Sequence, residues 1–262
     1  MKLEIYQIDT FTDKIFGGNP ACVIPLLEWP SNELLLKIAK ENAVAETAFF
    51  IDKGDKIHLR WFTPEIEMDL CGHATLATAH CLKTILNYSS NQIIFETLSG
   101  DLTVQIENEV YTLDLPARLP IQEGLPEIIK NSLNIQPKEV LKSRDYVLVY
   151  ENETEIKDLV IDRQIFDKIN LDPGGVVVTA KGDNCDFVSR YFTPQATILE
   201  DPVTGSAHCS LIPYWSERLN KNTMLAYQVS DRLGKIICEN KGDRITISGE
   251  AKTYFSGFMW TE

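Results

Sequence analysis

The segment Arg60-Trp61-Phe62-Thr63-Pro64 recurs 130 residues later as Arg190-Tyr191-Phe192-Thr193-Pro194, which indicates an internal repeat. Downstream, Gly72-His73-Ala74 is matched 133 residues later by Gly205-Ser206-Ala207, so three residues are inserted between the two matches. A short motif such as Phe-Thr-Pro can recur by chance. Two matches in the same order, at nearly the same offset, favour a duplicated fold instead.

A third match and a helical pattern extend the repeat. The runs Ser99–Val104 and Leu233–Cys238 each place a glycine before an alternating, strand-like stretch. After Gly72, small or apolar residues follow the spacing of one helix face; they are Ala74, Ala77, Thr78, Cys81, Leu82 and Ile85. A helix so rich in small residues suits burial on several sides, as when a sheet curls around a central helix.

The remaining pattern predicts many strands and few helices. Pro30 and Ser31 precede a helix expected over 32–41, with Ser31 as N-cap and Leu35, Ile38 and Ala39 on its apolar face. The predicted strands are Leu3–Asp9, Thr47–Ile51, Ile57–Phe62, Ile93–Thr97, Leu102–Ile106, Val110–Leu115, Tyr146–Tyr150, Val176–Thr179, Phe187–Phe192, Ile236–Glu239 and Arg244–Ile247. The elements do not alternate as βαβ units would, so the class is α+β. With a linker over Pro116–Pro120, we expect two pseudo-symmetric halves, residues 1–117 and 118–262.

Composition limits the function classes. The 262 residues carry 25 Lys and Arg against 38 Asp and Glu, a net charge of −13. Such a chain repels phosphates and anionic lipid, which argues against nucleic-acid or membrane-surface binding. No apolar run approaches the ~20 residues that span a bilayer, and the N-terminus reads as a strand rather than a signal peptide. We therefore expect a cytoplasmic protein.

The cysteines and histidines indicate neither disulfides nor a metal site. Six scattered cysteines without a C-x-x-C pair read as reduced, mostly buried thiols. The four histidines form no metal motif, and His80 and His208 are expected to be ordinary helix residues. There is no phosphate loop and no G-x-G-x-x-G. We expect no metal and no cofactor.

Two predicted helix starts could bind an anion. Gly72-His73 and Gly205-Ser206 each put a glycine and a polar residue at a helix N-terminus, where backbone N–H groups and the helix dipole attract negative charge. In a two-fold arrangement, both termini could hold one carboxylate ligand without Lys or Arg. The alternative is two helix caps without a ligand.

Three side chains are candidates for acid–base chemistry. Glu46 lies in the otherwise small or apolar stretch Ala43–Phe50, where desolvation would raise its pKa; the alternative is a glutamate at a strand edge facing water. His73 could act as a second acid–base or hydrogen-bonding group, or simply cap a helix. Asp201, before Pro202, could orient a histidine or bind a ligand amine, or only form a turn.

Together these residues resemble the phenazine-biosynthesis isomerase-like (PhzF-like) family. The resemblance rests on Asp9–Thr12, Gly18–Ala21, Ala45–Phe49, Arg60–Pro64, Cys71–Thr75 and Glu200–Ala207, which follow the family's order over most of the chain. It implies the fold of diaminopimelate epimerase, in which two pseudo-symmetric domains each curl a mixed sheet around a central helix. It also implies a cofactor-independent isomerase, usually a homodimer, acting on a small carboxylate.

The resemblance assigns roles to individual residues. It implies that Glu46 is the acid–base group that moves a proton between two carbons, supported by His73 and Asp201. It places substrate binding at Asn19, Gly72, Ala74, Gly205 and Ser206. The substrate itself does not follow.

Two other functions remain open. A two-thiol racemase needs one thiol in each half, and Cys71 could supply one; 133 residues later stands Thr204, whose hydroxyl is too weakly acidic. A non-enzymatic binding protein could keep the same fold. The presence of Glu46, His73 and Asp201 argues against that alternative.

Overall fold

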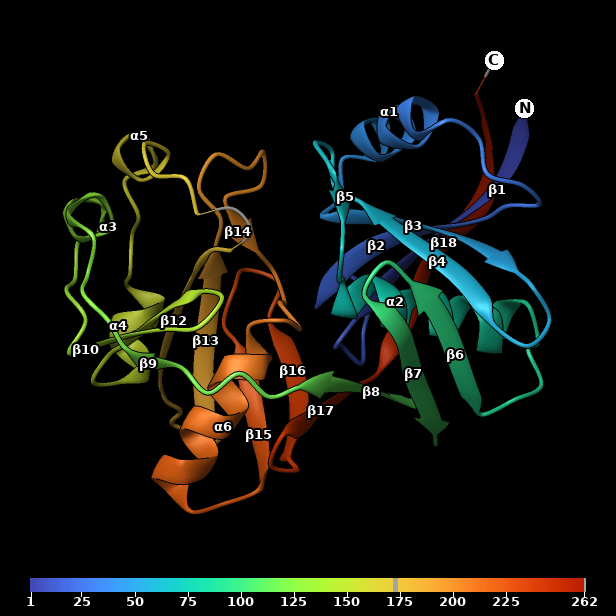
Figure 1. The fold of residues 1–262 in the computed structure, drawn as a ribbon. Helices are drawn as coiled ribbons and strands as arrows, with labels where there is room; N and C mark the ends of the chain where they lie inside the picture. The colour runs from blue at the N-terminus through green and yellow to red at the C-terminus, as the bar shows by residue number, and fades with distance from the viewer. Residues whose placement is uncertain (172–173, 262) are drawn as a thin grey trace. The chain divides into compact units, whose positions relative to one another are not determined.

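The computed structural model describes residues 1–171 and 174–261, and the chain forms two compact units. The first unit comprises Met1–Asp114 and the C-terminal segment from Ile247, and the second comprises Leu115–Thr246. We expected residues 118–262 to stay together as one half. The segment from Ile247 instead belongs to the first unit, because β18 (Ala251–Trp260) pairs along β1 (Lys2–Thr10), as Figure 1 shows.

The first unit is a mixed sheet with one helix on its outer face and one inside. Its further elements are β2 (Asn19–Pro25), α1 (Asn32–Asn42), β3 (Glu46–Asp52), β4 (Ile57–Phe62), β5 (Glu67–Met68), α2 (Gly72–His80), a π-helical segment (Cys81–Ile85), β6 (Gln92–Thr97), β7 (Gly100–Glu107) and β8 (Val110–Pro116). Backbone pairing runs in the order β18–β1–β2–β3–β4–β6–β7–β8. The β2–β3 and β4–β6 pairs are parallel, and the others are antiparallel.

The second unit repeats this order of elements. It contains β9 (Ile121–Gln122), α3 (Glu127–Ser132), β10 (Glu139–Lys142), β11 (Tyr146–Val149), α4 (Glu153–Lys157), α5 (Arg163–Phe166), β12 (Val176–Lys181), β13 (Phe187–Phe192), β14 (Glu200–Asp201), α6 (His208–Leu219), β15 (Thr223–Gln228), β16 (Gly234–Asn240) and β17 (Arg244–Gly249). Pairing runs β9–β10–β11–β12–β13–β15–β16, again with the third and fifth pairs parallel. The internal repeat of the sequence is therefore a repeat of topology.

The repeated Arg-aromatic-Phe-Thr-Pro motif builds the same ion pair in each unit. Arg60 holds Glu67 through two hydrogen bonds of 2.7 Å, and Arg190 holds Glu200 through two of 2.8 Å. Each guanidinium also lies over the phenylalanine two residues further along the same strand, Phe62 or Phe192. The motif thus clamps the short strand that precedes each central helix.

In the first unit the sheet curls around α2. All nine residues of this helix are buried, as its small side chains predict. At its C-terminal end, His80 bonds Tyr111 Oη of β8 through Nδ1 (3.0 Å) and Thr253 Oγ1 of β18 through Nε2 (2.9 Å). Because β8 and β18 are the two ends of the strand series, one histidine side chain joins both ends of the curled sheet.

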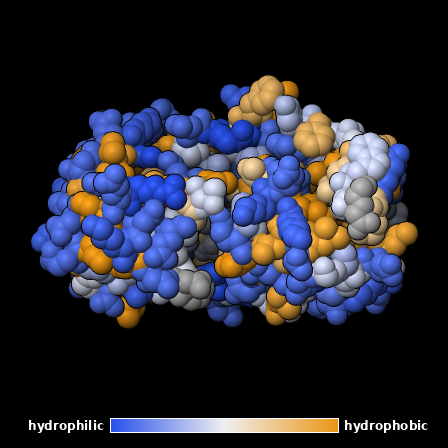
Figure 2. Space-filling view, turned by 90° about the horizontal axis from the view of Figure 1, so that it is seen from above, coloured by the Kyte–Doolittle hydropathy of each residue, from blue (hydrophilic) through white to orange (hydrophobic). Residues whose placement is uncertain are grey.

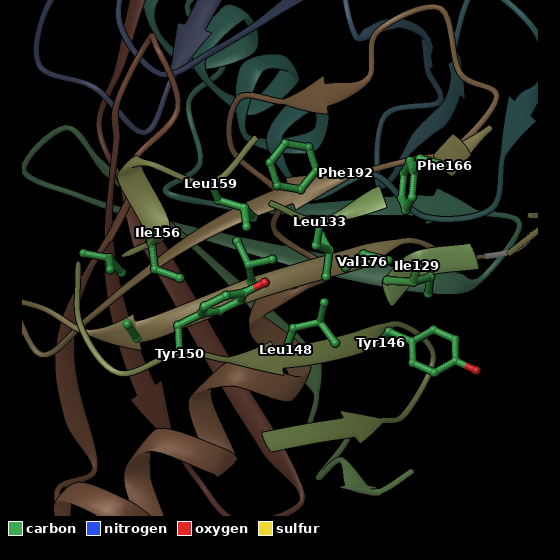
Figure 3. Close-up of a cluster of buried hydrophobic side chains, with 13 residues drawn as sticks. Ile129, Leu133, Tyr146, Leu148, Tyr150, Ile156, Leu159, Phe166, Val176 and Phe192 are labelled. Carbon is green, nitrogen blue, oxygen red and sulfur yellow. The ribbon is translucent and has the colours of Figure 1, made fainter. Parts of the chain in front are cut away.

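The outer face of each sheet has its own apolar core. In the first unit, α1 packs Leu35, Ile38 and Ala39 against the sheet. In the second, Figure 3 shows side chains of the short helices, among them Ile129, Ile156 and Phe166, against those of β11 and β12. Each unit therefore has helices on one face of its sheet and a buried helix on the other.

The central helix of the second unit contains a proline. Pro213 has no N–H, so the carbonyl of Cys209, four residues earlier, receives no bond from within α6. The backbone N–H of Arg118 donates to that carbonyl instead (2.8 Å). A residue that follows β8 thus supplies the donor that the helix lacks.

The surface and the helices add two observations. Figure 2 shows a face on which hydrophilic residues predominate and hydrophobic ones are scattered in small groups, in keeping with the acidic composition. Among the described residues, no helix has both the length and the apolarity needed to cross a membrane. The six cysteines are free thiols, and all but Cys185 are buried.

Candidate active site

Glu46 and His73 meet in the first unit. Glu46 is the first residue of β3, where its backbone pairs with Ala21 of β2, and His73 is the second residue of α2. Their side chains are 14% and 3% exposed, and Glu46 Oε2 lies 3.1 Å from His73 Nε2. Glu46 is therefore not the water-facing glutamate of a strand edge, but a largely buried carboxylate facing a buried imidazole.

Asn19 orients the His73 ring from its other nitrogen. The Nδ2 of Asn19, the first residue of β2, lies 3.2 Å from His73 Nδ1, and both residues are buried. With the Asn19 amide oriented in this way, Nδ1 accepts in the neutral form of the ring, and Nε2 carries a proton in both the neutral and the charged form. The ring N–H then faces Glu46.

Cys71 is the second neighbour of the same ring nitrogen. It precedes α2 as its N-cap residue, and its Sγ lies 3.6 Å from His73 Nδ1. Burial, chiefly, raises the pKa of this thiol to about 11, so it is protonated at neutral pH. As a thiol, Cys71 is a poor nucleophile but can share the hydrogen-bonding of the ring.

Opposing effects act on His73. Burial lowers the pKa of the imidazole, but its interactions with Cys71 and with the Glu46 carboxylate raise it, and the net pKa lies well above the ordinary value. Glu46 Oε2 and His73 Nε2 are both buried, yet neither makes a well-formed hydrogen bond within the described chain. Buried polar atoms of this kind indicate a site that a ligand or water completes.

Glu46, Cys71 and His73 form a group that could hold a metal ion. Each offers one ligand atom, and these atoms lie within 4.8 Å of one another. The thiol faces Nδ1 of the ring and the carboxylate faces Nε2. Contacts at both ring nitrogens also suit hydrogen bonding and proton transfer.

The other predicted site residues form a group in the second unit. Asp201 ends β14, and its Oδ2 accepts a hydrogen bond of 2.5 Å from Thr204 Oγ1. We expected a helix to start at Gly205. Instead, Gly205 and Ser206 lie in tight turns, with His208 N–H bonded to Gly205 O (3.1 Å), and α6 begins at His208.

Sequence analysis therefore identified residues in both groups. The structure brings Glu46, His73 and Asn19 together, with Gly72 and Ala74 beside His73 at the start of α2. It places Asp201, Gly205 and Ser206 together between β14 and α6. Sequence reasoning missed Gln228, a buried residue bonded to this second group, because nothing in its neighbourhood separates it from an ordinary strand residue.

Strand register shows that the second unit carries no copy of the acid–base pair. Thr47 pairs with Phe62, and Val176 pairs with Phe192, so Glu46 corresponds to Gly175. By the offset of 133, His73 corresponds to Ser206 and Cys71 to Thr204. None of these counterparts is ionisable near neutral pH, so the two units are alike in fold and different in chemistry.

Comparison with protein families agrees with the fold and the motifs. Residues 8–257 match the family model described as phenazine biosynthesis-like protein. The chain belongs to this phenazine biosynthesis-like family. An uncharacterized isomerase from Pseudomonas aeruginosa is 45% identical over 260 residues, 99% of each chain. Another, from Halalkalibacterium halodurans, is 43% identical over 97% of each chain. As a member of the phenazine biosynthesis-like family with such relatives, the chain is an isomerase by class.

Solved structures of the phenazine biosynthesis-like family show the same architecture. A PhzF family protein from Enterococcus faecalis matches with a TM-score of 0.93 and 42% identity, over 99% of this chain and 100% of that one. A hydroxyproline epimerase from Agrobacterium vitis, solved with bound trans-4-hydroxy-L-proline, matches with a TM-score of 0.60 and 10% identity. The match covers 98% of this chain and 92% of that one. The second match shows that the epimerase fold is shared.

Proposed function

We propose that this isomerase moves a proton between two carbons of a small carboxylate substrate, without a cofactor, and that Glu46 carries the proton. The observation behind this proposal is the buried Glu46–His73 contact of 3.1 Å, in which both facing atoms lack a well-formed hydrogen bond within the described chain. A carboxylate can accept a proton from one carbon and return it to another.

The neighbouring residues support the step. The imidazole N–H orients the Glu46 carboxylate, and Asn19 and Cys71 orient the imidazole. As Glu46 takes the proton, negative charge grows on the substrate. We assign His73 to stabilise that charge and Asp201 to orient the substrate.

A substrate carboxylate has a suitable partner at the start of α2. The N–H groups of the first helical turn, around Gly72 and Ala74, have no partner from within the helix. The Cys71 thiol lies within reach of the Ala74 N–H but makes no standard side-chain capping bond among the described residues. The positive end of the helix dipole favours an anion at this position. We propose the same role for the backbone N–H groups of Gly205 and Ser206, which lie in the turns just before α6.

The asymmetry of the two units favours one proton-carrying residue over two. A two-thiol racemase needs an acid–base group in each half, and the counterpart of Cys71 is Thr204. The counterpart of Glu46 is Gly175, which has no side chain. Proton transfer therefore centres on the first unit in this proposal.

Hydrogen–deuterium exchange at carbon tests the proposal with a panel of compounds in place of a single substrate. The purified protein is incubated in D₂O with small unsaturated and hydroxylated carboxylic acids, and proton NMR detects carbon-bound hydrogens that exchange. We expect exchange with at least one compound, its loss in Glu46→Gln, and its retention in Cys71→Ser. Exchange that survives in Glu46→Gln but disappears in Cys71→Ser would overturn the carboxylate mechanism in favour of a thiol.

A further inference from the structure

Gln228 ties down the segment that carries Asp201. It is the last residue of β15 and has no exposed surface. Its Oε1 accepts the backbone N–H of Thr204 (2.8 Å), and its Nε2 donates to the backbone oxygen of Asp201 (2.7 Å) and to Thr204 Oγ1 (3.2 Å). One side chain thus holds both ends of the four-residue segment from Asp201 to Thr204.

These bonds fix the direction of the Thr204 hydroxyl. Because Gln228 Nε2 donates to Thr204 Oγ1, the hydroxyl hydrogen is free to point elsewhere, and Asp201 Oδ2 lies 2.5 Å away. The result is a directed chain, from amide to hydroxyl to carboxylate. Hydrogen bonds that polarise one another in this way strengthen, and a donor to a carboxylate stabilises its ionised form.

The strand that presents Gln228 is held on both sides. Gln228 pairs with Ser189 of β13 in a parallel register and with Gly234 of β16 in an antiparallel one. The next N–H, of Val229, donates to Ser189 O (2.9 Å). A side-chain amide on such a strand supports its partners more rigidly than one on a loop would. Sites that need a fixed geometry require this rigidity.

We propose that Gln228 is a positioning residue for Asp201: through Thr204 it holds the Asp201 carboxylate in one direction. The inference rests on the proposed function, in which Asp201 contacts the substrate. A merely structural glutamine would stabilise the segment before α6 without affecting how Asp201 titrates. Measuring the pKa of the Asp201 carboxylate therefore distinguishes a positioning role of Gln228 from a merely structural one.

The test compares Thr204→Val with Thr204→Ser, and Gln228→Met with the wild type. Titration of Asp201 by carbon-13 NMR is the first readout, since it needs neither substrate nor turnover. Removal of the hydroxyl in Thr204→Val takes a donor from the carboxylate and so raises the pKa of Asp201, and Thr204→Ser restores it. Gln228→Met leaves the Thr204 hydroxyl free to turn and shifts the Asp201 pKa in the same direction. In the variant that combines Thr204→Val with Gln228→Met, the pKa shift is smaller than the sum of the two single shifts.

The second readout is the pH profile of the exchange reaction. In Thr204→Val and Gln228→Met, we expect the acid limb of the pH profile of kcat/KM to shift to higher pH together with the Asp201 pKa measured by NMR. We also expect kcat to change more than KM. An unshifted Asp201 pKa in folded Thr204→Val overturns the proposal, and so does a shifted pKa with an unmoved acid limb. Failure of the proposed function is distinct, because it shows as normal turnover in Glu46→Gln.

Discussion

The Oε2 atom of Glu46 lies 3.1 Å from the Nε2 atom of His73, and the two side chains come from a strand and a helix that are adjacent in space but 27 positions apart in the chain. The contact depends on the parallel pairing of β2 with β3, which brings Asn19 and Glu46 to the same end of the sheet, beside the start of α2. The contact between Glu46 and His73 is thus a product of the sheet register.

Shortening Glu46 tests how strictly the carboxylate must be placed. Glu46→Asp keeps the charge but withdraws the oxygens by one methylene, so we expect a loss of about 10²-fold in kcat, since misplacement by ~1 Å costs this much. Glu46→Gln removes the base altogether, and its loss should be at the upper end of ~10²–10⁴-fold. Rates of deuterium incorporation compare the two variants. Equal rates for Glu46→Asp and the wild type would contradict a role in proton transfer.

Gly175 should not tolerate a side chain. A Cβ at this position would lie 2.6 Å from Phe192 O and 2.7 Å from the hydroxyl of Tyr191. We expect Gly175→Ala to lower the free energy of unfolding by about 1–3 kcal/mol, as overpacking does. Urea denaturation measures the change.

Gly124 offers the matched control. A Cβ there meets no described atom within 4 Å, so Gly124→Ala should stay within about 0.5 kcal/mol of the wild type. If Gly175→Ala also leaves the free energy of unfolding unchanged, then the position that corresponds to Glu46 has room for a side chain. Crowding would then not explain why the second unit lacks a carboxylate there.

The repeated Arg–Glu pairs should be equally sensitive to substitution in both units. Arg60 and Glu67 are 14% and 22% exposed, and Arg190 and Glu200 are 15% and 23% exposed. Lysine cannot make the two parallel bonds of a guanidinium, so Arg60→Lys and Arg190→Lys should each lower stability by about 1–3 kcal/mol. Thermal unfolding followed by circular dichroism checks this. A large effect in one unit and none in the other would contradict a shared structural role.

Acid should weaken the fold through two buried histidines. Burial lowers the pKa of His80 to about 4, and His208 likewise to about 4. The unfolded groups titrate near 6.5, so their contribution to stability is fully present above that pH and is lost as the pH falls toward 4. At 1.36 kcal/mol per pKa unit, each histidine accounts for roughly 3 kcal/mol over this window.

His80→Gln removes one of these titrations while keeping a polar side chain between Tyr111 and Thr253. We expect a flatter decline of the urea midpoint between pH 6.5 and 4 in this variant. His73 has the opposite sign, since its pKa is raised: its contribution is present below pH 6.5 and is lost as pH rises through its folded pKa. An unchanged slope in His80→Gln would show that other groups cause the acid sensitivity.

Local signals in the sequence predicted much of the fold. The helix α1 begins at Asn32 as predicted, because Ser31 accepts the N–H of Leu34 and so caps it. The strands β4 and β13 have the predicted bounds, since each is rich in apolar residues and ends at a Thr-Pro turn. In both cases the physical cause lies within a few residues of the element, where a sequence pattern can show it.

Elements with distant partners were missed. Pro20 and Pro25 bracket β2 and read as turn residues, yet the strand is held by pairing with β1 and β3. The strand β18 carries several exposed aromatic residues, and its partner β1 lies more than 240 residues earlier in the sequence. Neither partner can be inferred from a local pattern.

The same distinction holds for the site. Apolar surroundings and family resemblance identified Glu46 and His73. The orientation of the His73 ring by Asn19 and Cys71 could not be predicted, because it depends on how β2 meets the start of α2. Gln228 could not be predicted either, since its contact with Thr204 joins positions 24 residues apart through a parallel strand pair.

The pairing of β18 with β1 has a consequence for how the protein is made. The chain leaves the first unit within β8 and returns within β17, so the strand that closes the first sheet is translated after the second unit. Before then, the edge of β1 and the side chain of His80 lack their partners in β18. The unit that carries Glu46 and His73 therefore precedes the second unit in the chain, but its sheet can close only after the second unit has been synthesised.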